Sequence, residues 1–237
     1  MRASLLVDVY NFFDLSVSQE TVRDLLILIE DSSTSETDHL DVRLYGGWFE
    51  AGILTRHASQ LVSDLSALRF PMRHPKRSGV LAGRIDLANA SLALAARSYG
   101  GTLRQRSGLK RVAFLDGQLP TSCAYPEDCA VQALKKFAKR RDSTCPTATC
   151  SVRNHEAFKH KEQKMVDTLL VLDALHLAAS SPRPRLVVAT DDLDLVPALD
   201  VAAASGCDVT LIARQAPDLN GLQEMFPTMA WRGTARV

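Results

Sequence analysis

The fold is decided by residues 185–212, which read RLVVATDDLDLVPALDVAAASGCDVTLI. Residues 185–189 form an apolar, β-prone run, typical of a strand buried on both faces of a sheet. Residues 196–204 have the pattern of a helix, Gly206 ends it, and residues 208–212 form the next β-prone run. Strand, helix and strand in this order predict a right-handed parallel crossover. We therefore expect a three-layer α/β/α sandwich with a mainly parallel central sheet.

The same alternation extends over the rest of the chain. We expect strands at 4–7, 42–49 and 110–115, and helices at 18–30, 53–68, 85–96, 127–141 and 164–179. The helix at 127–141 is basic and amphipathic. In the last helix Asp173 and His176 are three residues apart, which predicts a structural hydrogen-bonded pair.

Length and composition indicate one compact domain. The chain has 237 residues, of which 46% are hydrophobic and 23% charged, enough to bury a two-sided core. This excludes a disulfide miniprotein, a fibre and a disordered tail. Since no repeat of 20–50 residues is present, a solenoid is excluded as well. We predict a single domain over 1–237 that carries an insertion at about 117–160.

Charge is balanced overall but segregated along the chain. The net charge of +1 argues against a polybasic DNA-coating protein. Residues 69–164 hold 19 basic and 7 acidic residues, whereas the remainder holds 9 basic and 20 acidic residues. This pattern fits a phosphate-binding surface beside an acidic site, and it also fits two solvated faces.

The amino-terminal apolar run is too short for a signal peptide, because Asp8 and Asn11 interrupt it. No stretch of about 20 residues is apolar enough to cross a bilayer. Five cysteines in such a chain are expected to be reduced thiols. We therefore expect a cytoplasmic protein that does not contact a membrane.

Four aspartates lie where ligands bind in open α/β sheets, outside the carboxyl ends of the strands. Asp8 follows the first strand, and Asp192 and Asp194 follow the penultimate one. Asp167 lies in the first turn of the long helix, where the helix dipole favours an anion. If these carboxylates converge, their repulsion demands protons or a cation, and oxygen-only ligands suit Mg²⁺ or Mn²⁺. A plainer role for Asp192 and Asp194, capping the helix that follows them, stays open.

Three separated motifs resemble the signatures of NYN-domain proteins, members of the PIN-like ribonuclease superfamily. The motifs are LVDVYN at 6–11, KMVD at 164–167 and VATDDLDLVP at 188–197. The family pattern has an Asp and a nearby Asn after the first strand, a Lys-Gly-Val-Asp helix start, and Ser-Gly-Asp-Ser-Asp-Phe after the fourth strand. Three motifs in the right order are more specific than any one alone. The resemblance implies a PIN-like/NYN fold and a metal-dependent endoribonuclease, a hydrolase that acts on RNA.

The resemblance also implies roles for the catalytic site residues. Asp8 and Asp192 would be the most direct metal ligands. Asp167 and Asp194 would bind the metal through water or orient the attacking water. Asn11 would be a supporting polar contact.

The chain departs from the family pattern at several positions. Thr190 takes the place of the small hydroxyl residue, while Met165 and Asp191 replace glycines and Leu195 replaces Phe. Asp191 thereby adds a fifth carboxylate, which could change the position of the metal or which aspartate is its principal ligand. Lys164 is a candidate for stabilising the scissile phosphate, with a solvated lysine at the helix start as the alternative.

A cysteine cluster lies in the expected insertion, at Cys123, Cys129, Cys145 and Cys150. The four-residue gap between Cys145 and Cys150 suits half of a structural zinc site, whereas the gap between Cys123 and Cys129 is wider than usual. An irregular insertion with reduced thiols is the alternative. Cys207 lies beside a buried strand and is expected in the core.

A basic arm precedes Asp167 in the sequence. Its nucleic-acid-binding candidates are Lys135, Lys136, Lys139, Arg140, Lys161 and Lys164. We expect it to guide an RNA backbone, single-stranded or structured, with little base specificity. A solvated charged face is the alternative.

Two other functions stay open. A NYN-type fold could bind RNA or a protein without cutting. A haloacid-dehalogenase-like phosphatase also keeps an Asp after its first strand, but it needs a second Asp two residues later, and Tyr10 stands there. A homo-oligomer is compatible with either.

Overall fold

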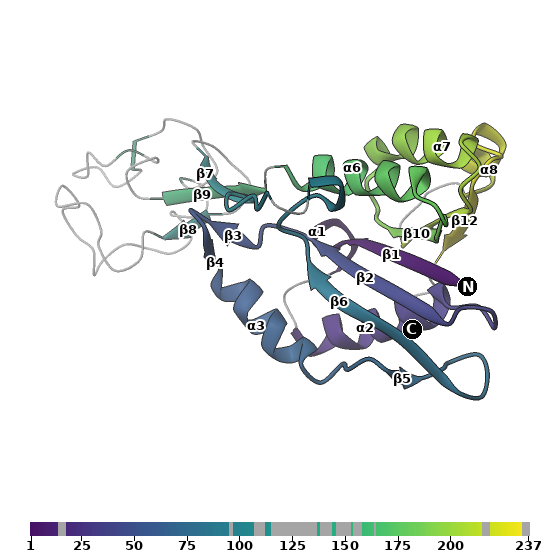
Figure 1. Cartoon of the computed structure of the whole chain (residues 1–237). Helices are drawn as coiled ribbons and strands as arrows, with labels where there is room; N and C mark the ends of the chain where they lie inside the picture. Colours follow the sequence, from purple (N-terminus) through teal and green to yellow (C-terminus); the bar gives the residue numbers. More distant parts are fainter. Residues whose placement is uncertain are drawn as a thin grey trace. The chain divides into compact units, whose positions relative to one another are not determined.

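The computed structural model describes residues 1–13, 18–94, 97–106, 112–114, 137, 144–145, 153, 158–163, 165–214 and 219–233. The chain divides into two compact units (Figure 1): Met1–Thr102 together with Met165–Val237, and Leu103–Lys164. The second unit contains the range expected as an insertion, most of which lies outside the described residues.

The first unit is built on a seven-stranded sheet in the order β12-β11-β10-β1-β2-β6-β5. Its strands are β1 (Arg2–Asp8), β2 (His39–Tyr45), β5 (Met72–Arg73), β6 (Val80–Leu87), β10 (Arg185–Ala189), β11 (Val209–Ala213) and β12 (Ala230–Gly233). All neighbouring pairs are parallel except β5 and β6, which are antiparallel. The mainly parallel sheet expected from the sequence is confirmed.

The strand order reverses at β1. The chain passes from β1 to β2 and then to β6 on one side, and it returns to β10, β11 and β12 on the other. Val7 of β1 is paired with Ala189 of β10, so the two strands reach the same edge of the sheet. In open α/β sheets this reversal leaves a crevice outside the carboxyl ends of the two strands, which is where ligands bind.

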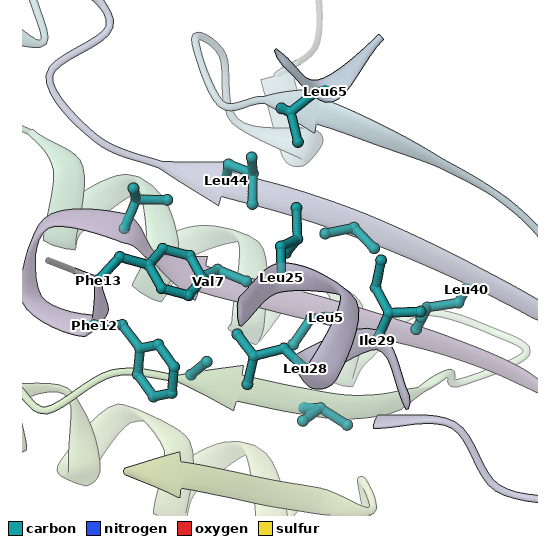
Figure 2. Close-up of a cluster of buried hydrophobic side chains, with 14 of the residues drawn as sticks. Leu5, Val7, Phe12, Phe13, Leu25, Leu28, Ile29, Leu40, Leu44 and Leu65 are labelled. Carbon is teal, nitrogen blue, oxygen red and sulfur yellow. The ribbon is translucent and has the colours of Figure 1, made fainter. Parts of the chain in front are cut away.

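Helices cover both faces of the sheet. In Figure 1, α2 (Ser18–Ser32) and α3 (Arg56–Leu65) lie on one side, and α6 (Val166–Ala179) and α7 (Val196–Ala204) on the other. Because side chains alternate along a strand, Leu5 and Val7 of β1 join the apolar cluster with α2 and α3 (Figure 2), whereas Leu6 joins the cluster with α6 and α7. This arrangement is compatible with a three-layer sandwich.

Two short helices complete the first unit. α1 (Val9–Phe12) follows β1 directly, and α8 (Leu219–Met225) precedes β12. The expected helices at 18–30, 164–179 and 196–204 are confirmed as α2, α6 and α7. The expected strands at 4–7, 185–189 and 208–212 are confirmed as β1, β10 and β11.

The expected helix at 85–96 is wrong. Residues 80–87 form β6, and only Leu92–Leu94 (η1) make one 3-10 turn. Leu81, Ile85 and Leu87 stand at even spacings, which place side chains on one face of a strand, and all three pack in the cluster with α2. The backbone of β6 approaches β2 so closely that a Cβ on Gly83 would lie 1.9 Å from the carbonyl oxygen of Leu40.

The boundaries around β2 also differ from expectation. β2 ends at Tyr45 rather than residue 49, and a hairpin of β3 (Phe49–Glu50) and β4 (Ile53–Leu54) follows. Its turn residues Ala51 and Gly52 have φ of 51° and 83°, as a tight hairpin turn requires. α3 therefore starts three residues later than expected, where the hydroxyl of Thr55 accepts a hydrogen bond from the backbone N–H of Ala58.

The second unit has a three-stranded antiparallel sheet in the order β7-β9-β8. Its strands are β7 (Leu103–Arg106), β8 (Val112–Phe114) and β9 (Phe158–Gln163). β8 falls within the strand expected at 110–115. Of the expected helix at 127–141, only Phe137 is described, and it is helical and buried. Among the described helices of both units, none has the length and apolar character needed to span a membrane.

Candidate metal centre at the sheet edge

Three of the sequence-predicted acids meet at the strand reversal. Asp8 is the last residue of β1, Asp192 lies at the start of η2 (Leu193–Leu195) just after β10, and Asp167 lies in the first turn of α6. One carboxylate oxygen from each lies within 4.8 Å of the others. Parallel strands end at a common edge, which is why acids so far apart in the sequence converge.

Asp8 is the buried member of this triad, with only 1% of its surface exposed. Its Oδ2 accepts hydrogen bonds from Asn11 Nδ2 at 2.8 Å and from Thr190 Oγ1 at 3.1 Å. Its Oδ1 is buried and has no hydrogen-bond partner among the described residues. A buried carboxylate oxygen without a donor is costly for the fold, and a cation at this position would satisfy it.

Burial raises the pKa of Asp8 from its ordinary 3.8 to about 6. The hydrogen bonds from Asn11 and Thr190 oppose this rise, because they stabilise the charged form. The negative charge of Asp167 adds to the rise. Asp8 is therefore a carboxyl group that a nearby positive charge would ionise.

Asp167 is the exposed member. Its pKa is also raised, first by partial burial and then by the charges of Asp192 and Asp194. Two unit charges about 5 Å apart repel by roughly 3 kcal/mol at an effective dielectric constant of 20. The triad therefore lowers its free energy by binding protons or a cation.

Asp192 has a capping role as well. Its Oδ1 accepts a 3.0 Å hydrogen bond from the backbone N–H of Asp194, which caps η2. Its own backbone N–H donates to Thr190 Oγ1 at 3.0 Å. The capping role and the metal role considered for Asp192 are thus compatible. Asp194 is exposed, and its charge contributes to the raised pKa of Asp167. It is not one of the three residues whose carboxylate oxygens lie within 4.8 Å of one another.

The fifth carboxylate, Asp191, points away from the triad. Its Oδ1 accepts a 2.6 Å hydrogen bond from the backbone N–H of Arg214, and its Oδ2 lies 3.7 Å from Arg214 Nε. Arg214 follows β11, on the side of β10 opposite to β1. This ion pair takes Asp191 out of the group of metal-ligand candidates.

No protein-family model matches this chain, and searches of curated proteins and of solved structures find no match either. The chemistry of the site must therefore be argued from its residues. The triad offers only hard carboxylate oxygens, it has one buried oxygen without a donor, and one of its members is open to solvent. These three carboxylates could together hold a metal ion.

A second buried acid was misinterpreted from the sequence. Asp173 does not pair with His176, which is exposed on α6. Asp173 Oδ2 instead lies 2.7 Å from Tyr45 Oη and 2.9 Å from Arg43 Nε. Its Oδ1 accepts from Ser91 Oγ at 3.0 Å and from the backbone N–H that follows Ser91 at 2.6 Å. Burial and the charge of Asp173 raise the pKa of Tyr45 well above its usual range.

This network lies on the same side of the sheet as the triad. Tyr45 is the register partner of Asp8, and Arg43 stands two residues earlier on β2. Side chains at register partners and at spacings of two share a face of the sheet. Helical spacing alone could not reveal the network, because the partners of Asp173 come from β2 and from the loop before η1.

Several predicted site residues lie outside the described residues. They are Lys135, Lys136, Lys139, Arg140, Lys164, Cys123, Cys129 and Cys150. Lys161 is described only as part of the β9 backbone, and Cys145 is a half-buried free thiol. Cys207 is a buried free thiol whose pKa is raised by burial, as expected for a core cysteine.

Proposed function

We propose that this chain is a metal-dependent endoribonuclease with a NYN-type, PIN-like fold. The observation that carries the proposal is the convergence of Asp8, Asp167 and Asp192 at the strand reversal between β1 and β10. Its support is twofold: the three aspartates occupy the acidic positions of the NYN-like motifs, and the buried Asp8 has an oxygen that lacks a donor.

Each residue has a distinct role in the proposed site. Asp8 and Asp192 would hold the ion, since Asn11 and Thr190 fix the orientation of Asp8 and the η2 cap fixes that of Asp192. The exposed Asp167 would bind the ion from the solvent side or orient the attacking water, and Asp194 would assist it. When bound, the ion makes a water molecule more acidic and offsets the negative charge of the phosphodiester.

The deciding experiment measures Mn²⁺ binding and RNA cleavage in the full chain. Isothermal titration should show Mn²⁺ binding that Asp8→Asn and Asp192→Asn each weaken by at least tenfold. Both variants should also lose Mn²⁺-dependent cleavage of a single-stranded RNA. Asp31→Asn is the matched control, because Asp31 lies at the end of α2 and outside the triad.

The outcomes separate the candidate functions. Cleavage that survives both triad substitutions would come from a contaminant or another site, and the proposal would be wrong. RNA binding without turnover in the presence of Mn²⁺ would favour a NYN-fold binding module. Wild-type protein that binds neither Mn²⁺ nor RNA would rule out both the nuclease and the RNA-binding module.

A further inference from the structure

Arg214 stands at the same sheet edge as the acidic triad. Ala189 of β10 is paired with Ile212 of β11, so Asp191 and Arg214 each lie two residues beyond a paired position. The backbone N–H of Thr190 also donates to the carbonyl oxygen of Ile212 at 3.1 Å, which holds the two strand ends together. The edge that collects the carboxylates therefore also carries a cation.

The guanidinium of Arg214 is held loosely by its neighbours. Its Nε lies 3.7 Å from Asp191 Oδ2 and makes no hydrogen bond within the described ranges. Its central carbon lies 4.9 Å from the centre of the Phe12 ring. Among the described residues, the Arg214 side chain contacts only Asp191 and Phe12, and neither contact uses a hydrogen bond from a terminal nitrogen. The side chain is 16% exposed, which leaves it accessible from solvent.

This arrangement suits an oxyanion. A guanidinium presents five N–H donors in a plane, remains charged at any physiological pH and binds phosphate oxygens in pairs. The central carbon of the Arg214 guanidinium lies over the Phe12 ring, a cation–π contact that uses none of the N–H donors. A largely buried cation with one distant counter-ion gains hydrogen bonds when a phosphate reaches it.

The position of Arg214 relative to the sheet separates it from the triad. Asp8 is on the α6 side of the sheet with Leu6, two residues before it. Phe12, which packs under Arg214, belongs to the cluster on the α2 side. Asp8 and Arg214 nevertheless both stand at the carboxyl edge of the sheet, where only β10 separates β1 from β11, so a phosphate bound at Arg214 would lie near the phosphate at the triad.

We propose that Arg214 binds a backbone phosphate adjacent to the scissile one, and that Asp191 is the counter-ion that holds its guanidinium in place before RNA binds. This inference rests on the proposed function, because it assumes an RNA strand at the sheet edge. It also gives a role to Asp191, which stands where the NYN-like pattern has a glycine.

The test measures binding of a single-stranded RNA oligonucleotide in a chelating buffer, where no cleavage occurs, over a range of salt concentrations. Arg214→Gln should weaken binding about tenfold and reduce the salt dependence by about one phosphate contact. Arg214→Lys should keep the salt dependence and lose part of the affinity. Asp191→Asn should strengthen binding, because it removes a negative charge beside Arg214. Mn²⁺ affinity should change less than twofold in all three.

Arg84→Gln is the matched control, since Arg84 also pairs with carboxylates but lies on β6. A purely structural ion pair would make Arg214→Gln and Asp191→Asn weaken RNA binding together, which would overturn the inference. If Arg214→Gln does not fold, the inference is tested by the other two variants: Arg214→Lys should weaken RNA binding and Asp191→Asn should strengthen it. If the wild type binds RNA and no variant changes that binding, the role of Arg214 is rejected while the proposed function stands. Wild-type protein that binds no RNA rejects the proposed function as well.

Discussion

The hydroxyl of Thr190 donates a 3.1 Å hydrogen bond to Asp8 Oδ2 across 182 residues of sequence. The hydroxyl oxygen of Thr190 also accepts a hydrogen bond from the backbone N–H of Asp192 at 3.0 Å. One hydroxyl thus joins the ends of β1 and β10 and relates the two acids proposed to hold the metal. Its bond to Asp8 also stabilises the ionised form of that carboxyl group.

Replacing Thr190 by valine should weaken metal binding. Thr190→Val keeps the shape of the side chain and removes the donor to Asp8, so the pKa of Asp8 should rise further above about 6. We expect Mn²⁺ affinity near pH 6.5 to fall about tenfold, with a smaller loss at pH 8. Titration calorimetry at both pH values checks this. Thr228→Val is the control, because Thr228 donates to Asp200 away from the triad; an equal loss in both variants would contradict the prediction.

The raised pKa of Asp8 also predicts how stability changes with pH. Between pH 4 and 6 the folded, metal-free protein holds a proton on Asp8 that the unfolded chain releases, because the pKa is about 6 when folded and 3.8 otherwise. Stability from this group is therefore lost as pH rises through that window, by about 3 kcal/mol in total.

Urea unfolding of the metal-free protein at several pH values measures this effect. Asp8→Asn cannot titrate, so its stability should depend less on pH between 4 and 6. Mn²⁺ should stabilise the wild type more at pH 7 than at pH 5, since binding requires the ionised carboxylates. Identical pH profiles for wild type and Asp8→Asn would exclude Asp8 as the source.

The network around Asp173 predicts a large loss of stability. Asp173 is fully buried and is the counter-ion of Arg43, which is 14% exposed. Asp173→Asn leaves the guanidinium without its carboxylate, which typically costs 3–5 kcal/mol. The urea midpoint should fall accordingly, while His176→Ala on the exposed face of the same helix should change stability by less than about 0.5 kcal/mol. Similar midpoints for the two variants would show that the ion pair contributes little.

The sequence predicted best the elements with long apolar runs. β10 and α7 have the boundaries expected from these runs; β10 is buried along its whole length, and α7 buries one face while Val201 and other residues remain exposed. β6 was misinterpreted as a helix because its apolar residues fit both periods over a short stretch. Only pairing with β2, which is remote in sequence, selects the strand.

The convergence of Asp8 and Asp192 could be predicted from the sequence, because parallel strands place their carboxyl ends at one edge of the sheet. The orientation of Asp191 could not be predicted, since it depends on Arg214 at the end of another strand. The buried pair of Asp173 and Arg43 was missed because neither side chain stands out in its own element.

The basic arm predicted from the sequence has a test of its own. Changing Lys135, Lys136 and Lys139 together to Glu reverses three charges, so RNA binding should weaken by at least tenfold and its salt dependence should become flatter. Fluorescence anisotropy at several salt concentrations measures both quantities. Mn²⁺ affinity serves as the control and should stay within twofold. Unchanged RNA binding would remove the arm from the proposed interface.

The backbone at Met165 predicts an unusual order of stabilities. Met165 precedes α6 with a φ of 64° and a ψ of 0°, a left-handed conformation that glycine adopts without strain and other residues adopt at a cost of roughly 1–2 kcal/mol. Glycine is also the residue of the NYN-like pattern at this position. Met165→Ala and Met165→Gly both remove the Met side chain, but only glycine relieves the strain.

At an ordinary helical position alanine is more stable than glycine by about 0.5–1 kcal/mol. At Met165 the order should reverse, with the glycine variant more stable than the alanine variant by about 1 kcal/mol in urea unfolding. Because Asp167 lies two residues further on, relief of strain at the start of α6 should leave Mn²⁺ affinity equal in the two variants. An alanine variant as stable as the glycine variant would mean that the left-handed conformation is not retained in solution.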